Sequence, residues 1–226
     1  MADIPLSLRR SPLRRAMPAT AEWALLGDAA YVRRIGDGGA PDRLAIADLS
    51  SLPRLGFKGA EALAGVARRG FRLEPHPNRA FRQADGGLCA ILGPTEALML
   101  CDPASPEDRL SRLAADWRIE DGERAYPVPR RDSHAWFAVK GDAAPEMFSR
   151  LCAIDLRPHR FADLDVAQTH VARLNAIVIR ADSGGRLLFH LLADSAAAVY
   201  LLRCLMDAGE EFDAGLVGLE TLWPAG

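Results

Sequence analysis

FKGAEAL, residues 57–63, and VKGDAAP, residues 139–145, are the two stretches that decide the fold. In each, a run of apolar residues ends in Lys-Gly and continues into small residues and an acid. Of the chain's 28 lysines and arginines only two are lysines, Lys58 and Lys140, and both stand in this setting, 82 positions apart. Two matching corners at this separation indicate an internal duplication.

The apolar spacing around these corners predicts the same order of elements twice: strand, Lys-Gly corner, helix, loop, strand, turn, strand, aspartate and helix. Alternating apolar residues indicate a strand, and apolar residues three to four apart indicate a helix. Asp102 and Asp194 close the last strand of each set. The expected strands are 43–50, 54–59, 87–93, 96–102, 134–141, 169–182 (one long strand or a bulged pair) and 186–194, and the expected helices are 60–71, 103–117, 142–156 and 195–209.

Local signals place several element ends. Ser105 is a good N-cap for the helix at 103–117, where Glu107 and Asp108 suit the positive helix end, and Ser195 is expected to cap the last helix. Residues 72–86 and 157–165 are expected to be loops. Two short strands, at 23–27 and 31–35, are expected around a Gly27-Asp28 turn.

The domain organisation follows from length and composition. Residues 1–22 are rich in proline and arginine and are expected to form an extended N-terminal arm. Two alternatives are open for this arm. It is expected either to be disordered in isolation or to lie along a partner, with the arginines at 9, 10, 14 and 15 meeting acidic groups. Residues 23–226 are expected to form a single domain with two half-repeats, at about 43–122 and 126–212, and a C-terminal tail.

Composition excludes several classes of protein. A net charge of −2 argues against an extended nucleic-acid surface. No stretch has 18 consecutive apolar residues and the N-terminus lacks an apolar signal core, so we expect a cytoplasmic protein without a membrane span. The cysteines at 89, 101, 152 and 204 form no CxxC pair, which indicates free thiols rather than a zinc or redox site.

No metal or catalytic site is evident from the histidines. No two of the five lie within four residues of each other, so no local ligand pair exists. His190 alternates with leucines and is expected to be a satisfied or half-exposed strand residue. His76 lies between prolines in a loop, where an interface role is possible. The G-x-S-x-G, Walker and G-x-G-x-x-G motifs are absent.

The Lys-Gly corners are the candidate binding residues. Gly59 and Gly141 permit backbone angles that other residues avoid. The helix start that follows carries partial positive charge, and Lys58 or Lys140 would add to it, so each corner could hold an anion. The simpler alternative is that glycine makes the corner and lysine only reaches solvent.

Three segments carry a family resemblance. ADLSSLPRLGFKGAEAL, residues 47–63, resembles the opening of the folate-binding domain of the glycine-cleavage T-protein. Together with Arg10-Ser11-Pro12-Leu13 and with Tyr200-Leu201-Leu202 in the late run 169–205, it resembles the gamma subunit of heterotetrameric sarcosine oxidase. The resemblance covers most of the chain.

What the resemblance implies is an α+β, folate-binding (T-protein/YgfZ-like) domain. It would have two intertwined β-α-β-β-α halves related by pseudo-two-fold symmetry. It also implies a complex that oxidatively demethylates sarcosine and passes the formaldehyde equivalent to tetrahydrofolate. FAD, FMN, NAD and tetrahydrofolate would belong to partner subunits. This chain, without a cofactor, would pack against the large alpha subunit, with beta and delta subunits in the same complex.

The resemblance also shows where a catalytic residue is missing. T-proteins carry a carboxylate within G-x-[IL]-D-D, but the corresponding residues 87–91 have no acid, and neither do residues 175–178 in the second half. The K-G-C-Y-x-G-Q-E segment of YgfZ-type proteins is also absent. We therefore expect no catalytic residues. Two alternatives stay open: a tetrahydrofolate-dependent aminomethyl- or methyltransferase, and a free-standing protein of this fold that binds another small acid.

Overall fold

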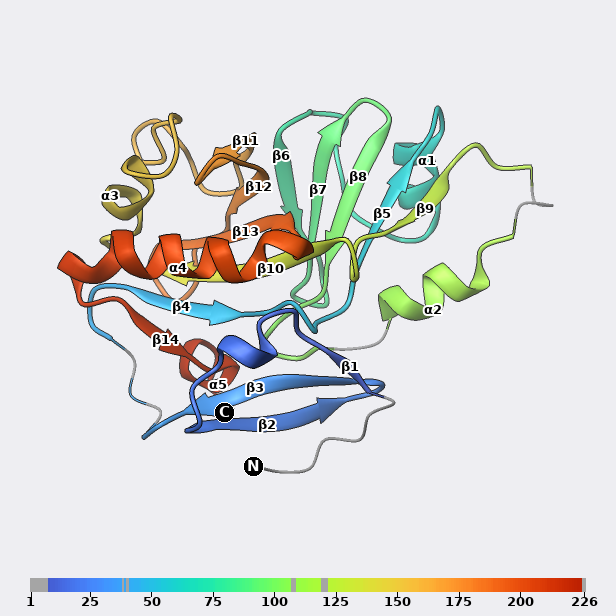
Figure 1. The fold of residues 1–226 in the computed structure, drawn as a ribbon. Helices are drawn as coiled ribbons and strands as arrows, with labels where there is room; N and C mark the ends of the chain where they lie inside the picture. Colours follow the sequence, from blue (N-terminus) through green and yellow to red (C-terminus); the bar gives the residue numbers. More distant parts are fainter. Residues whose placement is uncertain (1–7, 38, 40, 107–108, 119–121, 225–226) are drawn as a thin grey trace.

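The computed structural model describes residues 8–37, 39, 41–106, 109–118 and 122–224, which form three β-sheets. Two large sheets make the body of the protein, and a small N-terminal sheet lies below them (Figure 1). In the six-stranded sheet the strand order from edge to edge is β11 (Val166–Val171), β12 (Leu174–Arg180), β13 (Leu188–Asp194), β10 (His134–Lys140), β4 (Ala45–Asp48) and β14 (Gly215–Val217). In the five-stranded sheet it is β6 (Arg79–Arg82), β7 (Leu88–Gly93), β8 (Glu96–Leu100), β5 (Arg54–Lys58) and β9 (Tyr126–Pro129). In the N-terminal sheet it is β1 (Arg9–Arg10), β3 (Ala29–Ile35) and β2 (Ala21–Leu26).

The two large sheets pack against each other, and helices cover their outer faces. Trp136, Leu98 and Leu192 belong to the apolar cluster between the sheets. Phe148 and Leu201 place α3 and α4 against the six-stranded sheet, whereas α1 and α2 cover the five-stranded sheet. The helices are α1 (Ala62–Arg68), α2 (Arg109–Asp116), α3 (Ala144–Ser149), α4 (Ala198–Gly209) and α5 (Leu219–Leu222), with 3-10 turns at Arg14–Ala16, Ser195–Ala197 and Glu210–Phe212. None of the described helices is long and apolar enough to cross a membrane.

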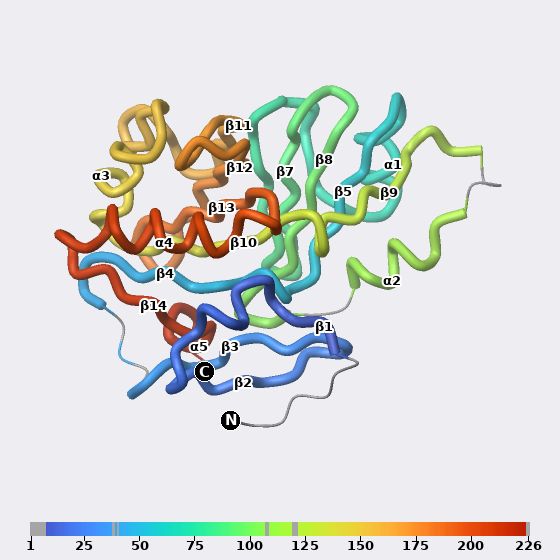
Figure 2. The backbone as a smooth tube through the Cα atoms, in the orientation of Figure 1, coloured from blue at the N-terminus to red at the C-terminus, as the bar shows by residue number. Residues whose placement is uncertain are grey.

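Two crossovers carry the chain between the large sheets. β4 precedes β5 in the sequence but pairs with β10 in the other sheet, and both neighbours of β10, β4 and β13, run antiparallel to it. β9 precedes β10 but pairs with β5, again antiparallel. In Figure 2 these crossovers run in opposite directions, from β4 to β5 and from β9 to β10. Each sheet therefore receives one strand from the part of the chain that builds the other.

The N-terminal segment differs from the expected extended arm. Residues 1–7 lie outside the described part of the chain, but Arg9–Arg10 pairs with β3 as strand β1. Leu13 is fully buried in the cluster beneath α4. The expected strands around Gly27-Asp28 are confirmed as the antiparallel pair β2 and β3. A buried leucine within a proline- and arginine-rich segment explains why composition indicated an arm where the chain is folded.

Other elements differ in extent. The expected loop at 72–86 contains β6, and β9 was not predicted. Helix α3 is shorter than expected, and α2 is described only from Arg109, so the expected Glu107 and Asp108 at its start lie outside the described residues. The expected helix at 195–209 begins with the 3-10 turn Ser195–Ala197, which is capped by Asp194, whose carboxylate accepts the Ala196 N–H at 2.8 Å. Helix α4 follows without a side-chain cap, so Ser195 is not the N-cap.

The segment 169–182, expected to be one long strand or a bulged pair, lies in a hairpin of β11 and β12 with a two-residue turn. Ala172 (φ 50°) and Arg173 (φ 66°) both take left-handed angles, which residues other than glycine and asparagine adopt rarely. The Tyr200 hydroxyl donates to the Ala172 carbonyl at 3.1 Å, and the Ala172 N–H donates to the Leu151 carbonyl at 2.9 Å. The resemblance motif at Tyr200 therefore holds an unfavourable turn in place.

Both Lys-Gly corners have the same backbone geometry. Gly59 (φ 137°) and Gly141 (φ 139°) lie at angles that side-chain-bearing residues avoid. A Cβ at either position would overlap a carbonyl oxygen, that of Arg124 or of Arg43, at the start of the neighbouring crossing strand. Glycine is therefore required where each strand passes into its helix.

We predict that Gly141→Ala lowers the free energy of unfolding by roughly 2–4 kcal/mol, because it combines a disfavoured φ with a backbone overlap. Gly93→Ala is the matched control: Gly93 has no positive φ, and a Cβ added there would meet no atom within 4 Å, so its effect should stay within about 0.5 kcal/mol. Urea denaturation of the two variants measures the difference. Equal midpoints would contradict the requirement for glycine at the corner.

Candidate functional site

The glycine N–H groups of the two Lys-Gly corners form hydrogen bonds within the protein. The Gly59 N–H donates to the Thr95 carbonyl at 3.0 Å, and the Gly141 N–H donates to the Leu187 carbonyl at 2.9 Å. The Lys58 ammonium pairs with Glu96 at 3.2 Å, although it is 63% exposed. The two corners belong to different sheets, and the structure does not bring them together.

The second corner is covered by the C-terminal segment. Lys140 Nζ donates to the Leu222 carbonyl at 3.1 Å, and burial lowers the lysine pKa, with the nearby Arg186 acting in the same direction. Neither glycine N–H is free for a ligand. These contacts favour the conformational role of the corners over anion binding.

The first two resemblance segments meet at a buried carboxylate. Asp48 accepts a short hydrogen bond from the Ser11 hydroxyl and another from the Ser50 N–H, at 2.9 Å. Ser11 Oγ also accepts the Leu13 N–H at 3.0 Å. Burial raises the pKa of Asp48, and the hydrogen bonds from Ser11 and Ser50 oppose that rise. This carboxylate therefore belongs to the internal packing of the N-terminal segment.

Arg54 is the centre of the polar interior. Its Nη1 donates to the Ser50 and Leu52 carbonyls, both at 3.0 Å, in the β4–β5 crossover. Its remaining N–H groups reach the β9–β10 crossover: Nε donates to Arg130 O at 3.1 Å, and Nη2 donates to Arg131 O at 2.7 Å and to His134 O. All five guanidinium donors thus end on backbone carbonyls, and burial lowers the arginine pKa to about 10.

His190 is a fully buried strand residue with a defined partner, which confirms the expected structural role. Trp136 Nε1 donates to His190 Nδ1 at 3.1 Å, so Nδ1 is the unprotonated nitrogen. Burial lowers the histidine pKa to about 3. The imidazole is therefore neutral near pH 7 and serves as an acceptor within the core.

An open cavity of about 440 Å³ lies at the edge of the space between the large sheets, and we call it the mouth. Polar side chains line it, among them His134, Gln168, His170 and Asn175, with Ile177 and Leu192 beneath. Gln168 Nε2 donates across to the Leu92 carbonyl of the other sheet at 2.6 Å.

No carboxylate lines the described part of the mouth. Glu96, on the neighbouring β8, is held by Lys58 and Arg130, and Arg130 Nη1 lies 3.4 Å from His134 Nε2. Burial, with Arg130, lowers the His134 pKa to about 4. The lack of an acid at 175–178 thus coincides with a described lining that has no carboxylate, whereas residues 87–91 contribute nothing to it.

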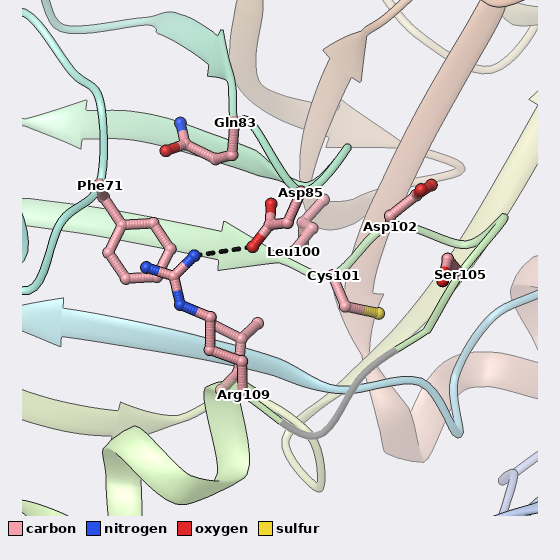
Figure 3. A pocket seen from close by; sticks show the side chains of 9 residues that line it. Phe71, Gln83, Asp85, Leu100, Cys101, Asp102, Ser105 and Arg109 are labelled. Carbon is pink, nitrogen blue, oxygen red and sulfur yellow. Dashed lines mark hydrogen bonds and ion pairs between the residues drawn. The ribbon is translucent and has the colours of Figure 1, made fainter.

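A smaller cavity of about 110 Å³ carries two carboxylates (Figure 3). Asp85 pairs with Arg109 at 2.7 Å and accepts the Gly87 N–H at 3.1 Å. Asp102 accepts the Ala104 N–H at 2.9 Å. Ligand pockets are usually about 300–1,000 Å³, so this cavity is too small for a folate-sized molecule.

The remaining candidate ligands are dispersed. Among the described residues no three His, Cys, Asp or Glu side chains are grouped to hold a metal ion. The four cysteines have free thiols, as expected. His76 is exposed, with Nε2 3.7 Å from a Glu74 oxygen. Sequence reasoning missed Arg54, although it lies within the resemblance segment. His134 was weighed only as one of the five histidines, without a role of its own.

Comparison with known proteins identifies the fold. No family model and no curated protein matches the chain. Among solved structures, a chain of the heterotetrameric sarcosine oxidase from Corynebacterium sp. U-96, in complex with pyrrole 2-carboxylate, is similar with a TM-score of 0.65 at 20% identity. The match covers 92% of this chain and 97% of that one.

A second solved structure is the glycine cleavage system aminomethyltransferase T from Bartonella henselae. It matches with a TM-score of 0.70 at 13% identity and covers 95% of this chain but 61% of that protein. The likeness to both confirms the expected T-protein-like α+β fold.

We predict that Arg54→Lys lowers the free energy of unfolding by roughly 2–4 kcal/mol, because an ammonium has three donors for five buried carbonyls. Arg112→Lys, at an exposed position on α2, is the control and should leave the denaturation midpoint unchanged. A variant at position 54 with the midpoint of the control would show that the five hydrogen bonds contribute little.

A pH dependence follows from His190. Its folded pKa of about 3 lies below the unfolded value of about 6.5, so the unfolded state binds more protons as pH falls. Below pH 6 its contribution to stability should decrease by about 1.4 kcal/mol per pH unit. His190→Gln keeps an acceptor for Trp136 but does not titrate. Its urea midpoint should therefore fall less between pH 7 and pH 4.5 than that of the unmodified protein; parallel curves would contradict this assignment.

Proposed function

We propose that this chain is a non-catalytic, gamma-type subunit of a heterotetrameric sarcosine oxidase complex. The observation that carries the proposal is the near-complete mutual coverage with one chain of such an enzyme. The resemblance segments support it, because a hydrogen bond from Ser11 to Asp48 joins two of them. In the proposed complex the other subunits oxidise sarcosine to glycine and hold FAD, FMN, NAD and tetrahydrofolate.

Two observations support a non-catalytic role. The described lining of the mouth has polar side chains but no carboxylate that could hold a pterin or steer an amine nitrogen. The buried Asp48 carboxylate already accepts hydrogen bonds from the Ser11 hydroxyl and the Ser50 N–H. In this reading the chain contributes surface contacts rather than chemistry.

The proposal includes a duplicated architecture within one domain. Half-repeats at about 43–122 and 126–212 would be related by a pseudo-two-fold axis. Reciprocal contacts support this relation: the Ala80 N–H donates to Leu164 O at 2.8 Å, and the Val166 N–H donates to Asn78 O at 2.9 Å. Asn78 (φ 62°) and Leu164 (φ 67°) also share a left-handed conformation. The matching strand orders of the two large sheets point the same way.

A second candidate is a tetrahydrofolate-dependent aminomethyl- or methyltransferase. The similarity in fold to an aminomethyltransferase favours it, and the mouth has the volume of a small-molecule site. The observation against it is that the described lining of the mouth has no carboxylate.

We expect the purified chain to elute without flavin and to leave sarcosine unoxidised. At micromolar concentrations it should co-elute with the large alpha chain of a heterotetrameric sarcosine oxidase. Separate elution of the two proteins would contradict the subunit assignment. Calorimetry with tetrahydrofolate distinguishes the second candidate: the subunit assignment predicts no heat of binding. Binding that weakens in Lys58→Ala or Lys140→Ala would instead favour a transferase with ligand-binding corners.

A further inference from the structure

Strand β2 (Ala21–Leu26) lies at an edge of the N-terminal sheet. It is the lowest strand in Figure 1, with β3 beside it. A strand at the edge of a sheet presents a row of backbone N–H and C=O groups to which another strand can bond. In the part of the chain that the structure describes, no loop, turn or helix is bonded to the Trp23 or Leu25 N–H.

The turn that follows β2 fixes which of its backbone groups point outward. The ladder with β3 pairs Leu26 with Ala29 across a two-residue turn. The residues that flank such a turn are hydrogen-bonded to each other, and bonded and non-bonded pairs alternate along an antiparallel ladder. Ala24 therefore bonds to β3, whereas Trp23 and Leu25 direct their N–H and C=O groups to the open side.

The other sheet edges among the described strands are short, contain proline or are partly covered. β9 carries Pro127 and Pro129, and β14 and β1 have three and two residues. Ala80 in β6 and Val166 in β11 donate their N–H groups to residues directly before the other strand. Proteins prevent strand addition by these means. β2 uses none of them, because its six residues include no proline or glycine.

The side chains of β2 suit pairing with a second copy of the same strand. Leu25 is 60% exposed, and the half-buried Trp23 lies on the same face. The only charged residue of the strand, Glu22, is paired with Arg33 of β3 at 3.0 Å. If two copies run antiparallel with Ala24 opposite Ala24, Trp23 lies opposite Leu25 of the second copy, and the two glutamates do not face each other. Aromatic cross-strand contacts of this kind stabilise sheets.

We propose that β2 pairs antiparallel with β2 of a second copy of this chain, across a two-fold axis at Ala24. Trp23 and Leu25 of each copy exchange backbone hydrogen bonds with Leu25 and Trp23 of the other, which satisfies the groups on the open side. The two N-terminal sheets become one continuous sheet. Because both copies use the same edge, the pairing closes at a dimer. This inference goes beyond the proposed function and does not depend on it.

Cysteine cross-linking tests the register. Opposed residues of a non-hydrogen-bonded antiparallel pair lie about 4.5 Å apart at Cα, which is within disulfide range. Ala24→Cys should therefore give a covalent dimer under mild oxidation, with the link at position 24 identified by peptide mass spectrometry. Glu22→Cys is the control, since the two positions 22 would lie four residues apart along the strands, roughly 13 Å, and should not be linked.

A proline at position 25 tests the backbone bonds. Leu25→Pro removes an N–H from the open side and leaves the bonds to β3 in place, so the dimer Kd should rise at least about 10-fold. Leu25→Val keeps the N–H and should change the Kd less than about 3-fold. Sedimentation velocity measures the association, and circular dichroism checks the fold. If Leu25→Pro does not fold, the cross-linking result decides.

The unmodified chain should have twice the mass of one copy in the micromolar range. A chain that stays monomeric throughout that range would overturn the proposal, and so would a dimer that is neither linked at position 24 nor weakened by Leu25→Pro. If Leu25→Pro instead weakens only the binding of a sarcosine oxidase alpha chain, the occupant of the edge is a strand of that chain, and the assignment to a second copy is wrong. Co-elution of the unmodified chain with the alpha chain tests the proposed function separately.

Discussion

Five carbonyl oxygens converge on one guanidinium, and the rest of the fold depends on that arrangement. Arg54 binds Ser50 and Leu52 in one crossover and Arg130, Arg131 and His134 in or directly after the other. Because each crossover carries a strand from one sheet into the other, their mutual position sets how the sheets pack. A lysine could not replace this fork, since it has fewer donors and no planar geometry.

The N-terminal segment depends on the same centre. Asp48 ends β4 at the start of the first crossover and receives Ser11 and Ser50, while Ser50 Oγ accepts the Trp136 N–H at 3.0 Å. Leu13, two residues beyond Ser11, packs into the apolar cluster beneath α4. A polar network and an apolar anchor therefore fix the same short stretch, which explains why two distant sequence segments share one family resemblance.

Much of the fold could be predicted from apolar spacing. β5, β8, β10 and β13 and the helix after each Lys-Gly corner were recognisable because long strands and short amphipathic helices carry local patterns. β9 was not, since two prolines in four residues disfavour a strand, and the β11–β12 turn was hidden by Ala172 and Arg173 in place of the usual glycine. The Arg54 site left no signal, because its partners are backbone carbonyls, which any sequence supplies.

Pro127 and Pro129 have a consequence for how copies of this chain can meet. β9 is an edge strand of the five-stranded sheet, and an exposed edge is a template on which further copies can add strands. Proline has no N–H, so these two residues remove donors that an incoming strand would need. The two prolines therefore oppose strand addition at this edge, and with it the growth of fibres from excess copies of the chain.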